Sequence, residues 1–150
     1  MLVKFRNDMK IFSRILIFAV LMSLVGCAGT GLKDSGTVIQ RMNVSSDSRS
    51  VFVLRDTGFA GGASSVDVRL NGNSIGTIGV GEVAVGTAIP GQNLLWADFT
   101  LYGLKGPAES TFKSNSSSNH YFVMTQTADL LTTKRRLIKV DEEQFKSYLK

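Results

Sequence analysis

The chain has 150 residues, 15 glycines, two prolines, one cysteine and a formal net charge of +5. Residues 1–26 hold four of its 17 basic residues and one of its 12 acidic residues, so the net charge of residues 27–150 is only +2. A net charge this small does not indicate a nucleic-acid partner. One cysteine and one histidine supply too few ligands for a zinc site, and a lone cysteine forms no internal disulfide. We therefore expect no metal and no cofactor.

The N-terminal segment has the three-part layout of a secretory signal. The stretch MKIFSRILIFAVLMSLVGC begins at Met9 with basic residues, continues through an uncharged run over residues 15–25, and ends in a small residue and a cysteine. The uncharged run is shorter than the roughly 20 residues of a membrane-spanning helix. We predict a signal peptide over residues 1–26, and Met9 is an alternative start because the signal is complete from there.

The end of this signal resembles the bacterial lipobox, in residues Leu24, Val25, Gly26 and Cys27. The resemblance implies cleavage before Cys27 and attachment of diacylglycerol to its thiol, and two or more acyl chains hold a protein stably on a membrane. An ordinary cleaved signal and an uncleaved anchor are the alternatives. The next residue, Ala28, is not the aspartate that resembles an inner-membrane retention mark. The resemblance therefore favours an outer-membrane lipoprotein that faces the periplasm over an inner-membrane one.

Residues 27–47 are rich in Gly, Ser, Thr and Asn and are predicted to form the lipidated N-terminus and a flexible tether. A flexible segment of about 20 residues has a root-mean-square reach of roughly 25 Å. Three apolar residues, Val38, Ile39 and Met42, would let the end of this tether pack as an edge strand. The folded domain is then predicted to span residues 48–150.

Strand patterns follow one another from residue 50 onward. The compact apolar run SVFVLRD over 50–56 is typical of a strand buried on both faces. In SVDVRLNGNSIGTIGV over 65–80, apolar and polar residues alternate on either side of NGN, which predicts a hairpin with one solvated face. GEVAVGTAIPGQN over 81–93 predicts a strand that ends at a Pro90-Gly91 turn.

The stretch LLWADFTLYG over 94–103 alternates and predicts a strand with two different faces. The apolar face, expected in the core, consists of Leu95, Ala97, Phe99 and Leu101. The opposite face consists of Trp96, Asp98, Thr100 and Tyr102.

The last part of the chain predicts two more strands and a helix. HYFVMTQT over 120–127 is typical of a central strand, and RRLIKV over 135–140 of a final one. DEEQFKSYLK then begins at an N-cap aspartate with a glutamine three residues on, which predicts a short helix. Phe145, Tyr148 and Leu149 share one side of that helix and are expected to dock it on the sheet.

The succession VFVLRDTGFAGGASSVDVRLNGNSIGTIGVGEVAVGTAIPGQNLL resembles bacterial lipoproteins that carry the domain of unknown function 2846. HYFVM resembles the aromatic strand that closes the family pattern, and the resemblance covers residues 49–127. It implies a small antiparallel Ig-like β-sandwich and no established activity. Together with the strand and helix patterns, it predicts a mainly β fold with a short C-terminal helix.

Two groups of residues are candidates for surface contacts. Trp96 and Tyr102 are spaced to form a sugar-stacking platform, or they are packed beneath a loop or the C-terminal helix. A basic cluster would contact anionic headgroups or an acidic partner, or it is a solvated hairpin end balanced by the acidic residues at 141–143. This cluster consists of Lys134, Arg135, Arg136 and Lys139.

Enzyme motifs are weak in this chain. The glycines over 76–86 are not followed by the helix that a phosphate-binding loop requires. The sequence also has no G-x-S-x-G motif, so His120 has no serine nucleophile to activate as a general base. We therefore expect a non-enzymatic binding or structural module of the cell envelope. Its partners would be the lipid membrane, through acylated Cys27, and an envelope protein or polysaccharide. A carbohydrate- or envelope-polymer-binding module is the alternative, and a hydrolase would need polar groups converging on His120.

Overall fold

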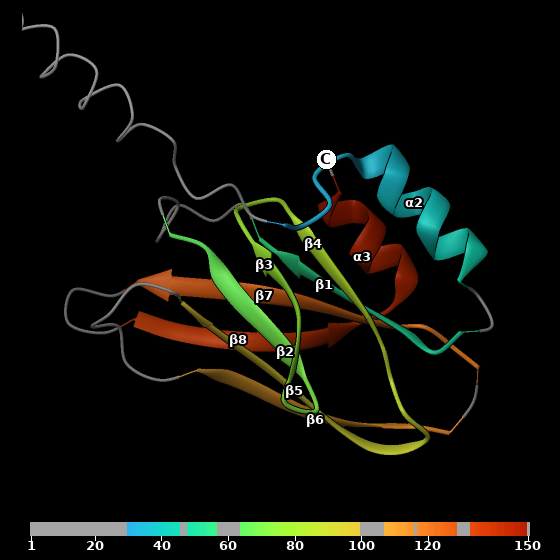
Figure 1. Ribbon diagram of the computed structural model, residues 1–150. Coiled ribbons are helices and arrows are strands. Elements are labelled where there is room, and N and C mark those ends of the chain that lie inside the picture. The colour runs from blue at the N-terminus through green and yellow to red at the C-terminus, as the bar shows by residue number, and fades with distance from the viewer. Residues whose placement is uncertain are drawn as a thin grey trace, which may run out of the picture.

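The computed structural model describes residues 30–45, 48–56, 64–99, 107–115, 117–128 and 133–149. These residues form two helices and eight strands (Figure 1). The helices are α2 (Ser35–Val44) and α3 (Glu142–Tyr148). The strands are β1 (Ser50–Arg55), β2 (Val66–Leu70), β3 (Asn73–Ile78), β4 (Val83–Thr87), β5 (Gly91–Phe99), β6 (Ala108–Ser114), β7 (His120–Ala128) and β8 (Thr133–Val140).

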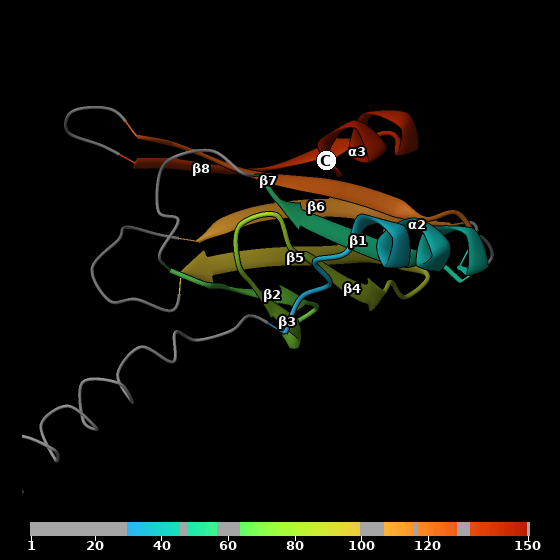
Figure 2. The ribbon, with the colours of Figure 1, turned by 90° about the horizontal axis from the view of Figure 1, so that it is seen from above.

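The strands form two four-stranded sheets. We name the sheet with the order β4-β1-β7-β8 sheet A and the sheet with the order β3-β2-β5-β6 sheet B. Seen from above, β7 and β8 lie towards one side of the molecule and β2 and β3 towards the other (Figure 2). The predicted mainly β, sandwich-like architecture is confirmed.

The described strand pairs are antiparallel except one, the parallel pair β1–β7. The sandwich is therefore mainly antiparallel, and it departs from the predicted antiparallel pattern at one pair in the centre of sheet A. Parallel neighbours need a long crossover connection. Here the chain passes through β4 and the whole of sheet B between β1 and β7, so it re-enters sheet A in the direction of β1.

The hairpin β2–β3 confirms the turn predicted at NGN. Asn71 has φ 52° and Gly72 has φ 84°, and a type I′ turn requires positive φ at both central residues. Asn71 also receives a hydrogen bond, because its Oδ1 accepts from the backbone N–H of Leu94 at 2.9 Å. The turn is thus fixed against the start of β5.

The core between the sheets is built from alternate residues of the strands. Val53 and Phe122 from sheet A and Val68 and Leu95 from sheet B are all fully buried. The rings of Phe122 and Phe112, which belong to opposite sheets, have centroids 5.1 Å apart. The predicted core positions Leu95 and Ala97 are confirmed, while the side chain of Phe99 and residue 101 lie outside the description.

The outer face of sheet A carries a second apolar cluster beneath the two helices. Because both of its faces are covered, β1 is buried along its whole length, as SVFVLRD predicts. Helix α3 begins with the predicted capping box between Asp141 and Gln144, and Phe145 is fully buried against the sheet. Tyr148 remains 41 % exposed and contributes less to docking than its spacing predicts.

The predicted flexible tether is wrong from Thr30 onward. The backbone N–H of Thr30 donates to Thr77 O at 2.7 Å, and Leu32 and Val83 exchange two backbone hydrogen bonds of 2.8 Å. Gly31 allows this approach, because a Cβ there would lie 2.8 Å from side-chain atoms of Glu82 and Ile78.

Residues 35–44 form a helix and not the expected edge strand. Asp34 caps it by accepting from the Thr37 N–H at 2.6 Å, and Val38 and Met42, one turn apart, are buried on sheet A. Residues 27–29 and 46–47 of the predicted tether lie outside the described residues. The folded unit therefore includes residues 30–45 in addition to the predicted domain.

Candidate functional site

Trp96 lies on the outer face of sheet B, because its neighbours Leu95 and Ala97 point into the core. It is paired across the strands with Arg69 and Glu109. The Arg69 guanidinium carbon lies 5.1 Å from the centroid of the indole ring. The C-terminal helix covers the other sheet, so the alternative that this helix covers Trp96 is wrong. Tyr102 lies outside the described residues.

The predicted basic cluster does not form one surface. Arg135 has a side chain only 2 % exposed, and its Nη1 lies 3.2 Å from Asp98 Oδ1. Burial lowers the pKa of Arg135, and the charge of Asp98 partly opposes this change. Arg136 and Lys139 are exposed, and the side chain of Lys134 is not described. The side chain of Arg135 is thus buried in an ion pair, which fits neither the surface contact nor the solvated hairpin end considered for it.

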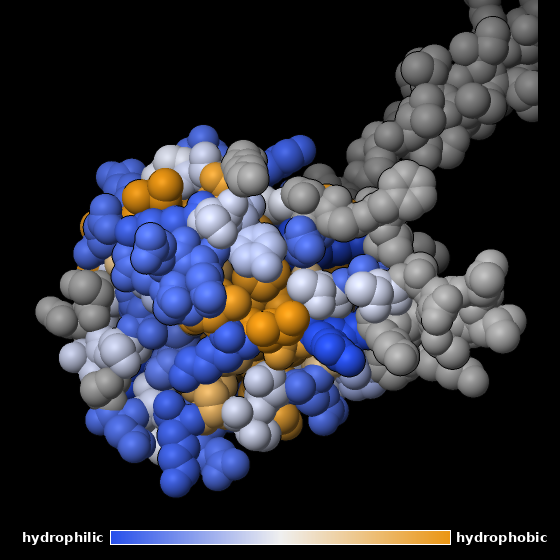
Figure 3. Space-filling view, turned by 180° about the vertical axis from the view of Figure 1, so that it is seen from behind, coloured by the Kyte–Doolittle hydropathy of each residue, from blue (hydrophilic) through white to orange (hydrophobic). Residues whose placement is uncertain are grey.

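The face behind the view of Figure 1 is mainly hydrophilic, with a small hydrophobic group near its centre (Figure 3). Among the described residues, the large apolar side chains that remain exposed come from several different elements. They are Ile39 and Val44 of α2, Ile89, Leu94 of β5, Ile138 of β8 and Tyr148 of α3.

His120 is packed in the sandwich. It is 6 % exposed, its ring centroid lies 4.7 Å from that of Phe112, and its Nε2 is buried without a hydrogen-bond partner. Burial lowers the pKa of His120 below its ordinary 6.5, and the charge of Lys139 lowers it further. The imidazole is therefore neutral at pH 7.

Acidification from pH 7.5 to 5.5 is expected to lower the melting temperature through His120. Its folded pKa lies below its unfolded pKa of 6.5, so protons bind preferentially to the unfolded chain as the pH falls through 6.5. Glu142, whose pKa is lowered from 4.5, affects the stability only at pH values below this interval. The measurement is thermal unfolding at both pH values. His120→Gln should show a smaller change, and an equal change in both chains would contradict this role.

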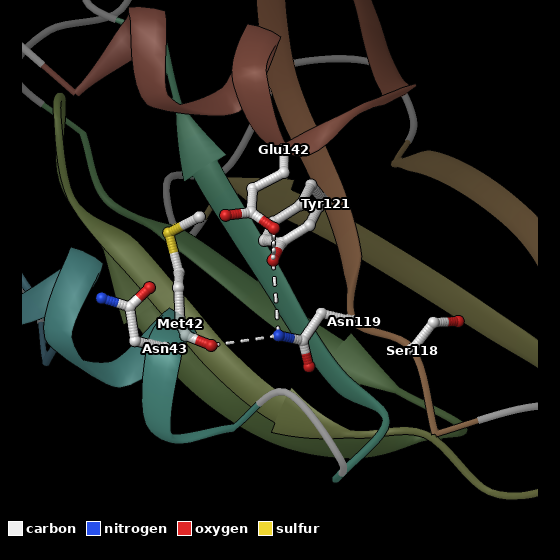
Figure 4. Close-up of a pocket in the computed structure, with 6 residues that line it drawn as sticks. All are labelled: Met42, Asn43, Ser118, Asn119, Tyr121 and Glu142. Atoms are coloured by element: carbon white, nitrogen blue, oxygen red, sulfur yellow. Dashed lines mark hydrogen bonds between the residues drawn. The ribbon is translucent and has the colours of Figure 1, made fainter.

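A pocket of about 400 Å³ lies between the end of α2, the turn before β7 and the start of α3. We name it the Tyr121 pocket, and it is lined by Met42, Asn43, Ser118, Asn119, Tyr121 and Glu142. Figure 4 shows Asn119, Tyr121 and Glu142 turned toward one another, with Asn43 and Ser118 on either side. None of these residues was predicted to belong to a site.

The centre of the Tyr121 pocket is a chain of hydrogen bonds. The Asn119 side-chain amide donates to Met42 O and to Tyr121 Oη, each at 3.3 Å. The Tyr121 hydroxyl donates to Glu142 Oε2 at 3.3 Å. Asn119 Oδ1 accepts from the backbone N–H of Ser50 at 3.2 Å, which fixes the amide from the other side.

The pKa values of the two titratable groups of this pocket shift in opposite directions. Burial raises the pKa of Tyr121, and the nearby Glu142 carboxylate raises it further, so the phenol keeps its proton. The hydrogen bond from Lys146, 2.5 Å from Glu142 Oε1, lowers the pKa of Glu142. The pocket at neutral pH therefore holds a protonated phenol and an ionised carboxylate.

Within the part of the chain that the structure describes, no group of three or more His, Cys, Asp or Glu side chains is placed to hold a metal ion. The described residues also contain no helix that is long and apolar enough to cross a membrane. Cys27 and the other lipobox residues lie outside them. Comparisons with protein-family models, curated proteins and solved structures find no match to this chain.

Proposed function

We propose that this chain is a lipid-anchored outer-membrane lipoprotein whose domain faces the periplasm and serves as a non-enzymatic binding or structural module. The observation that carries this proposal is the LVGC sequence at residues 24–27, at the end of an uncharged run preceded by basic residues. The resemblance to lipoproteins with the domain of unknown function 2846 remains part of the proposal. The mainly β sandwich is consistent with that resemblance.

The folded unit begins close to the proposed anchor. Thr30 is hydrogen-bonded to β3, and covalent geometry limits the distance from the Cys27 Cα to the Thr30 Cα to about 11 Å. A flexible 20-residue tether would have reached roughly 25 Å. The anchored domain is therefore held beside the lipid surface, where a partner in the same membrane would meet it at high effective concentration.

A second candidate function is binding of a carbohydrate or another envelope polymer. Trp96 favours it, because the indole lies on the outer face of sheet B beside exposed Arg69. Aromatic rings stack on sugars, and an adjacent guanidinium supplies hydrogen-bond donors for hydroxyl groups.

Replacing Cys27 by Ser is expected to release the protein from the membrane fraction. Serine has no thiol to receive diacylglycerol, so the variant loses the acyl chains that hold the domain. The measurement is separation of bacterial envelopes into soluble, inner-membrane and outer-membrane fractions, with wild type expected in the outer membrane. A Ser48→Ala chain is a control that leaves the lipobox intact. Equal distribution of wild type and Cys27→Ser would contradict the proposal.

A further inference from the structure

We propose that the Tyr121 pocket binds the primary ammonium group of a small hydroxylated or amide-containing ligand. This inference rests on the proposed function as a binding module and gives that module a ligand class. The pocket volume of about 400 Å³ falls within the range of small-molecule sites and accommodates a monosaccharide or an amino-acid residue.

The donors at the centre of the pocket, on Asn119 and Tyr121, are already used within the protein. Both N–H groups of the Asn119 amide donate, to Met42 O and Tyr121 Oη, and the single phenolic proton of Tyr121 donates to Glu142. Carbonyl and carboxylate oxygens carry more than one lone pair, so Met42 O and Glu142 Oε2 retain acceptor capacity. A ligand that binds these two oxygens must therefore bring donors.

The charges of the pocket favour a cationic donor. Glu142 contributes an ionised carboxylate, and Lys146 contacts its Oε1, whereas Tyr121 contacts its Oε2. Met42 and Asn43 belong to the last turn of α2, where the helix dipole places partial negative charge. The basic residue of that turn, Arg41, lines a separate pocket with Thr37, Gln40 and Val44.

An ammonium group has three donors and no acceptor, and it therefore suits a set of oxygen acceptors of this kind. Two sources of this chemistry are an amino sugar and the free amine of an amino-acid residue. D-Glucosamine and Nα-acetyl-L-lysine amide represent the two sources. N-Acetylglucosamine is the matched neutral sugar, because it differs from glucosamine in the acylation of the amine.

The experiment is a titration of the full chain in detergent micelles, followed by nuclear magnetic resonance of the Asn119 side-chain amide. At least one of the two amines is expected to shift this resonance in a saturable manner, and N-acetylglucosamine is not. The tighter of the two amines identifies the source. Absence of a shift with both amines, or an equal shift with the neutral sugar, would overturn the proposal.

Variants on α3 test the charge directly. Glu142→Gln keeps the shape of the side chain and is expected to weaken amine binding about tenfold, the scale of one charge-assisted hydrogen bond. Glu143→Gln, on the same helix and outside the pocket, is the matched control and should bind as wild type. Equal effects of these two substitutions would contradict the role of Glu142.

Lys146→Met gives a second measurement that does not depend on the folding of Glu142→Gln. It removes the cation that contacts Glu142 and is expected to strengthen amine binding about two- to fivefold, the range of an exposed ion pair. Unchanged or weaker binding in this folded variant would overturn the proposal. None of these outcomes changes the membrane fractionation of Cys27→Ser, so failure of this inference is distinguishable from failure of the anchor.

Discussion

Replacing Phe122 by Ala is expected to lower the free energy of unfolding by about 3–5 kcal/mol, the range for a large aromatic removed from a core. Phe122 is fully buried and lies in β7 at the centre of sheet A. Its ring contacts Phe112 of sheet B, so its removal leaves a cavity where the two sheets meet. The measurement is denaturant unfolding followed by circular dichroism.

Ile138→Ala is a suitable control for this substitution. Ile138 lies on the neighbouring strand β8 and is 43 % exposed, so its truncation is expected to cost less than about 1 kcal/mol. Similar losses in Phe122→Ala and Ile138→Ala would contradict the position of the core between the sheets.

Met42→Ala is expected to cost about 2–5 kcal/mol, the range for a buried methionine. Met42 is 2 % exposed in the apolar cluster that includes Phe52, Tyr121 and Phe145. A flexible tether would tolerate this change without loss of stability. Denaturant unfolding of Met42→Ala therefore distinguishes a packed helix from the flexible tether that the composition predicts.

Val44→Ala is the matched control because it lies on the same helix and is 80 % exposed. It is expected to change the free energy of unfolding by less than about 0.5 kcal/mol. If Met42→Ala and Val44→Ala were equally mild, helix α2 would not contribute to the folded unit.

The strands could be predicted because their signals are local. Alternation in VDVRL, the NG turn at residues 71–72 and the capping box at Asp141 each specify a conformation through residues adjacent in the chain. The uninterrupted apolar run of β1 also predicts burial on both faces, although the sequence does not say that helices cover the second face.

Helix α2 was not predictable from composition, because Ser35, Gly36, Thr37 and Asn43 all have weak helix propensity. Its stability comes from burial of Val38 and Met42 on sheet A and from the Asp34 cap. Tertiary packing of this kind overrides propensity. The spacing of Val38 and Met42, four residues apart, and the aspartate at position 34 are signals that fit a helix better than a strand.

The Tyr121 pocket is also not predictable from the sequence, because its residues come together only through tertiary packing. Asn119 belongs to a serine-rich turn and Glu142 to the first turn of a helix, and each is common in such places. Only the fold brings them beside Met42, which is 77 residues from Asn119 in the chain. The basic residues over 134–139 are close in the sequence, but they do not form one surface. They belong to strand β8, and adjacent side chains of a strand point to opposite faces of the sheet.

The anchor is the central claim, and the mass of the intact protein purified from bacterial membranes tests it most directly. A chain that begins at Cys27 and carries the added mass of a diacylglyceryl group and a further acyl chain is the predicted result. A chain that retains residues 1–26, or that begins at another residue with an unmodified Cys27, would contradict the account.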